Sequence, residues 1–151
     1  MKYYIAYGSN LNIGQMSRRC PGCIPIGTGL LDGWKLVFRA HANIEKSQGD
    51  SVPVGVWEIT DSDEFALDRY EGYPGYYRKQ SVTMTLRPFI GEPSEITAMV
   101  YVMHHFRPII PPTTEYYRTI ADGYDDFGLD TKPLIDALKA SLITYNYKTK
   151  G

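Results

Sequence analysis

The pattern of apolar and polar positions predicts a chain with more strands than helices. β-Branched and aromatic residues cluster, or alternate with polar ones, in four runs that are typical of strands. These runs are residues 2–7, 52–59, 76–86 and 96–103. The last run is apolar on both faces, which predicts a strand that lies between a core and a covering helix.

A further pair of strands is predicted on either side of Asp32-Gly33. Residues 27–31 and 34–39 have strand-like composition, and an Asp-Gly dipeptide between two such runs is a strong signal for a hairpin turn. We therefore expect the chain to reverse at these two residues. Residues 40–45 are expected to continue the second strand, and the polar residues 46–51 to form a loop.

Capping signals mark the expected helices. A short helix is predicted over residues 13–19, with Asn12 at its N-cap and Gln15 at the spacing of a capping box. A second helix is expected to begin after Thr60 and to end before Gly72. The last two helices are expected within residues 113–123 and 131–145.

Because most predicted strands follow one another without an intervening helix, antiparallel pairing should dominate. The predicted fold class is α+β: a small, strongly curved, largely antiparallel sheet that can close into a barrel, with helices at its side and rim. We expect residues 1–151 to form a single domain. No glycine-rich phosphate loop stands at a strand–helix junction, which argues against a nucleotide cofactor.

Composition narrows the class of partner. Apolar residues make up 43% of the 151 positions, and the net charge is −1 with no basic stripe, which argues against a nucleic-acid partner. No apolar run approaches the roughly 18 residues that a membrane-spanning helix needs. The N-terminal residues lead directly into a predicted strand and contain no apolar segment typical of a signal peptide, so a cytoplasmic location is expected. Two cysteines cannot form a disulfide framework, which agrees with this expectation. Tyrosine, at 13 residues, suits a small pocket that is both dry and hydrogen-bonding.

The segment Tyr7-Gly8-Ser9-Asn10-Leu11 is the first candidate for chemistry. It joins a strand to a helix, and backbone N–H groups in such a turn can hold a carboxylate or a developing oxyanion. An ordinary turn, with Ser9 and Asn10 bonding their own backbone, explains the same residues. The nucleophile motif G-x-S-x-G is not matched, because Leu11 stands at its second glycine.

Glu71 is the second candidate. It shares a face of the second predicted helix with Leu67 and Tyr70, and it lies at the helix C-terminus, where the dipole disfavours negative charge. Burial and dipole both raise a carboxyl pKa, which suits a general base near neutral pH. The alternative is an exposed glutamate in a fraying last turn. The aromatic residues 72–77 that follow can wall a pocket.

The remaining polar residues give weaker signals. Cys20-Pro21-Gly22-Cys23 favours a structural turn over a redox pair, and no second Cys-x-x-Cys completes a zinc site. His104 and His105 are adjacent, so on a strand they face opposite sides and cannot bind one metal ion together. No metal is therefore expected. Tyr116, near the start of the third predicted helix, is by itself more typical of a core or surface tyrosine.

Taken together and in order, these segments resemble the gamma-glutamylcyclotransferase-like superfamily. The resemblance covers most of the chain, from about residue 3 to residue 129. The segments that carry it are residues 7–11, 19–21, 55–59, 67–73, 76–78 and 112–116. Asn12 stands where some members have a second leucine.

The resemblance implies a small mixed-strand barrel and a cofactor-independent reaction on a small gamma-glutamyl substrate. Family members convert gamma-glutamyl amides into 5-oxoproline and a free amine or amino acid. Carried onto this sequence, Glu71 becomes the catalytic acid and base, and Tyr116 positions the substrate. The substrate-binding loop comprises Tyr7, Gly8, Ser9, Asn10, Leu11 and Asn12. Removal of a gamma-glutamyl protecting group within a pathway and a non-catalytic binding role remain open, as does the oligomeric state.

Overall fold

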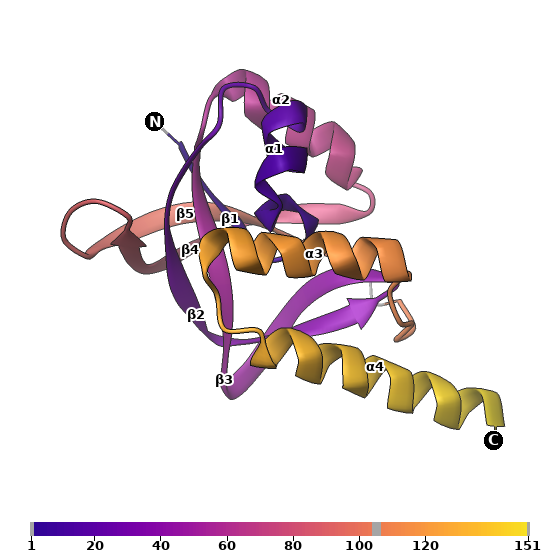
Figure 1. The fold of residues 1–151 in the computed structure, drawn as a ribbon. Coiled ribbons are helices and arrows are strands. Elements are labelled where there is room, and N and C mark those ends of the chain that lie inside the picture. The colour runs from indigo at the N-terminus through magenta and orange to yellow at the C-terminus, as the bar shows by residue number, and fades with distance from the viewer. Residues whose placement is uncertain (1, 104–106, 151) are drawn as a thin grey trace.

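Two long strands and three shorter ones close into a barrel. The computed structural model describes residues 2–103 and 107–150, so His104 and His105 lie outside the described residues. Its strands are β1 (Lys2–Ala6), β2 (Ile24–Arg39), β3 (His41–Ile59), β4 (Tyr77–Pro88) and β5 (Ser94–Met103). They follow the order β1-β3-β2-β4-β5 around the barrel, and the parallel pairing of β1 with β5 closes it (Figure 1). The other pairings are antiparallel, which confirms the predicted mixed barrel.

The predicted hairpin at Asp32-Gly33 is wrong. Strand β2 continues through these residues, and both of its halves pair with β3. Gly33 has a φ of +82°, which a glycine adopts without strain, and it lies in a β-bulge where the pairing register shifts. The chain instead reverses at Ala40, between the paired residues Arg39 and His41. Long-range pairing with β3 therefore outweighs the local turn signal.

The same pairing corrects the prediction for residues 40–51. These residues are neither the end of the preceding strand nor a loop, because β3 begins at His41 and includes the polar segment 46–51. Lys46 pairs with Trp34 and Ser51 with Asp32, so the residues between Lys46 and Ser51 bulge out opposite Gly33. The polar composition reflects the exposure of this bulge rather than a break in the strand.

The ends of the first two helices agree with the capping signals, whereas the last two helices run further along the chain than the predicted residues 113–123 and 131–145. The helices are α1 (Ile13–Arg19), α2 (Asp61–Glu71), α3 (Thr114–Phe127) and α4 (Lys132–Lys150), and a single 3-10 turn, η1 (Ser9–Leu11), precedes α1. Asn12 caps α1 by accepting the Gln15 N–H at 3.0 Å. Gly72 ends α2 in the left-handed conformation. Figure 1 shows α1 and α2 together at one end of the barrel, α3 across its side and α4 extending outward.

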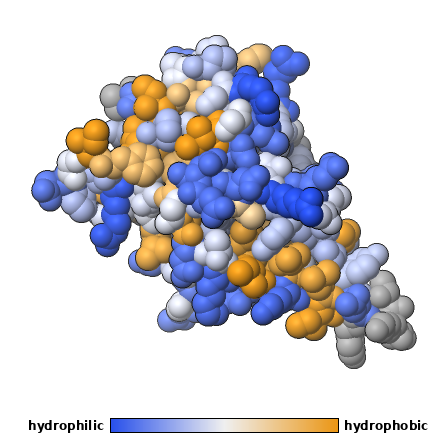
Figure 2. Space-filling view, viewed as in Figure 1, coloured by the Kyte–Doolittle hydropathy of each residue, from blue (hydrophilic) through white to orange (hydrophobic). Residues whose placement is uncertain are grey.

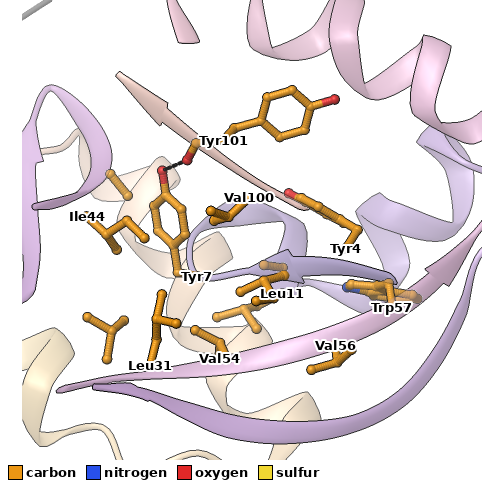
Figure 3. Close-up of a cluster of buried hydrophobic side chains, with 14 of the residues drawn as sticks. Tyr4, Tyr7, Leu11, Leu31, Ile44, Val54, Val56, Trp57, Val100 and Tyr101 are labelled. Atoms are coloured by element: carbon orange, nitrogen blue, oxygen red, sulfur yellow. Dashed lines mark hydrogen bonds between the residues drawn. The ribbon is translucent and has the colours of Figure 1, made fainter. Parts of the chain in front are cut away.

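The core fills the barrel and the space under the helices. It includes Val54, Val56 and Trp57 of β3, and Leu11 of η1 is also fully buried (Figure 3). One side of α4 packs against β2 and is buried through Leu134, Ala137 and Ser141. Elsewhere on this helix the apolar side chains of Ile135, Leu142 and Ile143 are exposed. Figure 2 shows apolar side chains gathered along α4. No helix among the described residues has the length and apolar character needed to cross a membrane.

Candidate active site

The candidate site is a cavity of about 230 Å³. It lies where the end of β1, the η1 turn, the end of α2 and the start of α3 meet the barrel. Among the described residues that line it, seven are tyrosines, and Glu71 supplies the acidic side chain. The lining comprises Tyr4, Tyr7, Gly8, Ser9, Asn10, His41, Ala42, Tyr70, Glu71, Tyr76, Tyr77, Tyr101 and Tyr116.

Glu71 is the last residue of α2 and points its carboxyl group into this cavity. Its side chain is half-buried, so the exposed position in a fraying turn is not what the structure shows. Burial raises the pKa of the Glu71 carboxyl to about 7, while the positive charge of Arg19 opposes the rise. The neighbouring Tyr70 is 44% exposed, so it does not share the burial of Leu67.

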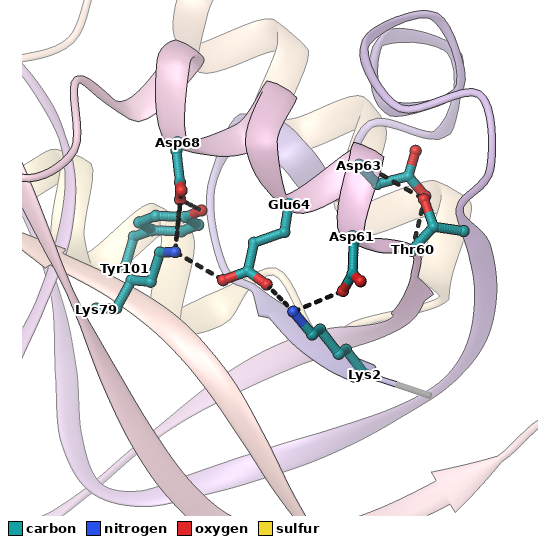
Figure 4. Close-up of polar contacts among 8 residues, drawn as sticks. All are labelled: Lys2, Thr60, Asp61, Asp63, Glu64, Asp68, Lys79 and Tyr101. Atoms are coloured by element: carbon teal, nitrogen blue, oxygen red, sulfur yellow. Dashed lines mark hydrogen bonds and ion pairs between the residues drawn. The ribbon is translucent and has the colours of Figure 1, made fainter.

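A polar network between α2 and the barrel strands fixes the direction of this helix. Tyr101 donates its hydroxyl to the Asp68 carboxylate at 2.6 Å, and Lys79 forms ion pairs with Asp68 and Glu64 (Figure 4). Lys2 of β1 also pairs with Glu64, at 2.5 Å. Since Tyr101 lines the cavity, this network ties the helix that carries Glu71 to a wall of the site.

The Asn10 side chain connects the η1 turn to Glu71. Its amide Nδ2 donates to Glu71 Oε1 at 3.2 Å and to the Tyr4 hydroxyl at 2.9 Å. Its Oδ1 accepts from the Arg19 guanidinium, and its backbone carbonyl accepts the Trp57 indole N–H at 3.0 Å. Asn10 is only 3% exposed, so these bonds hold it rigidly beside the Glu71 carboxyl.

The η1 turn leaves some of its N–H groups available. Leu11 N–H donates to the Gly8 carbonyl and Asn12 N–H to the Ser9 carbonyl. The Leu11 N–H is therefore already used, contrary to the expectation that the whole Gly8–Leu11 turn offers donors. The N–H groups of Ser9 and Asn10 precede these bonds and have no backbone acceptor among the described residues.

Gly8 lies close against the cavity wall. A Cβ at this position would lie 3.2 Å from the Cβ of Ala42 and 3.6 Å from the Tyr116 hydroxyl, inside the cavity. The structure thus brings Tyr7, Gly8, Ser9 and Asn10 of the predicted loop to the cavity. Leu11 and Asn12 do not line it, because Leu11 packs in the core and Asn12 caps α1.

Tyr116 also lies in the cavity wall, although nothing near it in the sequence required that position. Its hydroxyl accepts the Ala42 N–H at 3.0 Å, and its ring packs edge-on against His41. The Tyr7 hydroxyl donates to the Tyr101 carbonyl at 2.7 Å (Figure 3). Burial raises the pKa of Tyr7 and of Tyr116, so both hydroxyls stay protonated at neutral pH.

Sequence reasoning missed Tyr4, His41, Ala42 and Tyr101. These residues come from β1, β3 and β5, and only closure of the barrel brings them together. The large number of tyrosines was the one available signal, because it indicated a dry, hydrogen-bonding pocket without saying which residues form it.

Cys20 and Cys23 occupy the structural turn that the sequence favoured. Cys23 N–H donates to the Cys20 carbonyl, and both cysteines are free. Burial raises the pKa of the Cys23 thiol to about 11, which keeps it in the less reactive protonated form. Across residues 2–103 and 107–150, no group of three or more His, Cys, Asp or Glu side chains is placed to hold a metal ion.

Comparison with known proteins decides the family. The family model described as "Gamma-glutamyl cyclotransferase, AIG2-like" matches residues 4–124, which include both Glu71 and Tyr116. The chain belongs to this family. It is 31% identical to the gamma-glutamylcyclotransferase of Bos taurus and 32% identical to that of Mus musculus, each over 139 residues. Those alignments cover 83% of this chain and 71% of each relative.

Solved structures show the same architecture. A structure described as a gamma-glutamyl cyclotransferase superposes with a TM-score of 0.74 and 29% identity, covering 92% of this chain and 86% of the other. The Bacillus subtilis protein YkqA, at 18% identity and a TM-score of 0.72, shares the fold. The protein is an enzyme of the gamma-glutamylcyclotransferase type.

Proposed function

We propose that the enzyme converts gamma-glutamyl amides into 5-oxoproline and a free amine or amino acid. The observation that carries this proposal is the Glu71 carboxyl, which lines a small cavity opposite the η1 turn and has its pKa raised to about 7. A carboxyl group whose pKa lies near the working pH serves well both as a base and as an acid. The family match supplies the reaction class.

The substrate brings its own nucleophile. In the proposed reaction the α-amine attacks the γ-carbonyl of the same molecule, and a cavity that folds the substrate makes this step effectively unimolecular. Glu71 first removes a proton from the α-ammonium, and the freed nitrogen lone pair forms the lactam C–N bond. The bond to the leaving nitrogen then breaks. Two protons pass in total from the α-nitrogen to the leaving nitrogen, and Glu71 carries them one at a time.

The η1 turn is assigned to binding and charge stabilisation. The free N–H groups of Ser9 and Asn10 are suited to the tetrahedral oxyanion or to the substrate α-carboxylate. We assign Tyr7, Gly8 and Tyr116 to the walls that position the gamma-glutamyl group. Leu11 and Asn12 act indirectly, by holding the turn in place.

Replacement of Glu71 tests the proposal. Glu71→Gln keeps the size and the Asn10 contact but cannot accept a proton, so 5-oxoproline release should fall by at least ~100-fold. Glu115→Gln, an exposed change at the start of α3, is the matched control and should keep full activity. Release is measured by chromatography on a panel of gamma-glutamyl amides and dipeptides, and thermal unfolding verifies that each variant is folded.

Two outcomes would contradict this assignment. Full turnover by Glu71→Gln would show that Glu71 is not the catalytic acid and base. If the wild-type enzyme released no 5-oxoproline from any substrate of the panel, the proposed reaction would be contradicted. The panel also tests removal of a gamma-glutamyl group from a larger pathway amine. The cytoplasmic location stays a prediction.

A further inference from the structure

A second positive charge, Arg107, stands beside two of the residues that line the cavity. The Arg107 guanidinium lies 4.2 Å from the centre of the Tyr76 ring, and Tyr76 itself lines the cavity together with His41. Burial and then the charge of Arg107 lower the pKa of His41, so the cation is close to both lining residues. Arg107 is not itself among the residues that line the cavity, but its guanidinium lies over the ring of one that does.

The backbone that carries Arg107 is fixed to the turn between β2 and β3. The Arg39 guanidinium donates to the Arg107 carbonyl and is itself held by Glu45, with Nε 2.6 Å from Oε2. Ala40 N–H donates to the Ile110 carbonyl at 2.8 Å, which anchors the same segment a few residues further on. These contacts give Arg107 a defined place beside the cavity although its side chain is exposed.

The ring beneath Arg107 is fixed as well. The Tyr76 hydroxyl is hydrogen-bonded to His41 Nδ1 at 2.8 Å, and its ring packs edge-on against Tyr77, whose hydroxyl donates to the Ala42 carbonyl. Among the described residues, no carboxylate lies within ion-pair distance of Arg107. The guanidinium thus rests on a fixed aromatic ring and has no acidic partner within residues 2–103 and 107–150.

Tyr76 and His41 form the part of the cavity wall that is next to this cation. With the gamma-glutamyl group beside Glu71 in the cavity of about 230 Å³, a leaving group that extends along this wall comes close to Arg107. A leaving amino acid or peptide carries a carboxylate there, whereas a simple leaving amine carries none. Guanidinium matches carboxylate with two parallel hydrogen bonds, and stacking on an aromatic ring leaves its N–H edges available.

We infer that Arg107, resting on Tyr76, binds the carboxylate of the leaving group and makes the enzyme select gamma-glutamyl amino acids and peptides over gamma-glutamyl amines. This inference rests on the proposed function and names its substrate class. Arg107 is then a specificity-determining residue. Tyr76 and His41 act through it, as positioning residues.

A pair of matched substrates isolates the carboxylate. Gamma-glutamyl-alanine and gamma-glutamyl-ethylamide differ only in the carboxylate of the leaving group. For the wild-type enzyme we expect a kcat/KM about tenfold higher for the alanine substrate, the scale of a hydrogen bond to a charged group. In Arg107→Gln this preference should disappear, because KM for gamma-glutamyl-alanine rises while the ethylamide is affected far less.

The control variant is Arg87→Gln, which removes an exposed arginine near the opposite end of β4 from Tyr77 and should keep the wild-type preference. Equal kcat/KM values for the two substrates in the wild type, or an equal loss on both in Arg107→Gln, would overturn the inference and leave the proposed function standing. If neither substrate yields 5-oxoproline, the proposed function fails, and the inference fails with it.

Discussion

Glu71 occupies a position that favours chemistry over stability. It is the last residue of α2, where the helix dipole opposes a negative charge, and it is half-buried in a cavity lined mainly by tyrosines. Both effects were visible in the sequence, from the spacing of Glu71 relative to Leu67 and to Gly72. What the sequence did not show is Asn10, whose amide fixes the carboxyl from a segment 61 residues away.

The raised pKa of Glu71 predicts the pH dependence of the reaction. Glu71 acts first as a base, so it must be deprotonated, and that form is lost as the pH falls through about 7. We therefore expect kcat/KM to drop about tenfold for each pH unit below this value. Initial rates of 5-oxoproline release between pH 5 and pH 9 measure the profile.

A change at Arg19 tests whether the fall of kcat/KM at low pH is due to protonation of Glu71. Because the charge of Arg19 lowers the pKa of Glu71, Arg19→Gln should move the bend of the profile to higher pH. Arg18→Gln removes the same charge from the neighbouring exposed residue and should leave the bend in place. A bend that does not respond to Arg19→Gln would indicate that another group titrates.

At the scale of elements, α2 shows where local signals suffice. Thr60 and Asp63 form a reciprocal capping box, with the Thr60 hydroxyl accepting the Asp63 N–H and the Asp63 carboxylate accepting the Thr60 N–H. Both ends of the helix were predicted, the start from Thr60 and the end from Gly72. Asp63 does more than cap, however, because its other oxygen accepts the Gly22 N–H at 3.1 Å and joins α2 to the turn after α1.

Removal of Asp63 should therefore destabilise the protein more than loss of a cap alone. Asp63→Ala leaves two N–H groups without their acceptor near the buried Cys20, so the free energy of unfolding should fall by about 2–3 kcal/mol. Asp61→Ala, in the same helical turn but exposed, should change it little. Urea unfolding of both variants makes the comparison, and equal losses would rule out the bridging role of Asp63.

Strand β2 shows where local signals fail. The Asp32-Gly33 dipeptide carries a strong turn preference, but both halves of β2 gain a partner by pairing with β3. A bulge satisfies the conformational preference of Gly33 without reversing the chain. The element boundary was thus decided by a pairing between segments whose mutual register no local pattern specifies.

At the scale of the whole molecule, the packing of α3 against η1 completes the site. Gly123 of α3 lies directly against the backbone of Leu11, since a Cβ there would lie 2.6 Å from the Leu11 carbonyl carbon. Asn12 adds a bond from its Nδ2 to the Thr119 carbonyl at 3.1 Å. These contacts hold the predicted substrate-binding turn and Tyr116 in a fixed relation.

Gly123→Ala tests this arrangement. The added methyl group must push α3 away from the turn, so we expect a loss of about 1–3 kcal/mol in the free energy of unfolding and a rise in KM. Gly14→Ala is the control, because a Cβ in α1 has its nearest neighbour at 3.5 Å and should stabilise that helix by up to ~1 kcal/mol. An unchanged KM in a folded Gly123→Ala variant would show that α3 does not position the site.

The sequence by itself determined the α+β class and the ends of α1 and α2, and it named Glu71 and the loop Tyr7–Asn12 as candidates, because caps, periodicity and short motifs depend on residues close together in the chain. Tyr116 became a candidate only through the family resemblance. The tertiary structure decided that β2 bulges at Gly33, that Asn10 orients Glu71, and that Tyr4, His41 and Tyr101 share one cavity with them. It also placed the Arg107 guanidinium over the ring of Tyr76. Each of these depends on pairings and contacts between distant segments, which only closure of the barrel brings within reach.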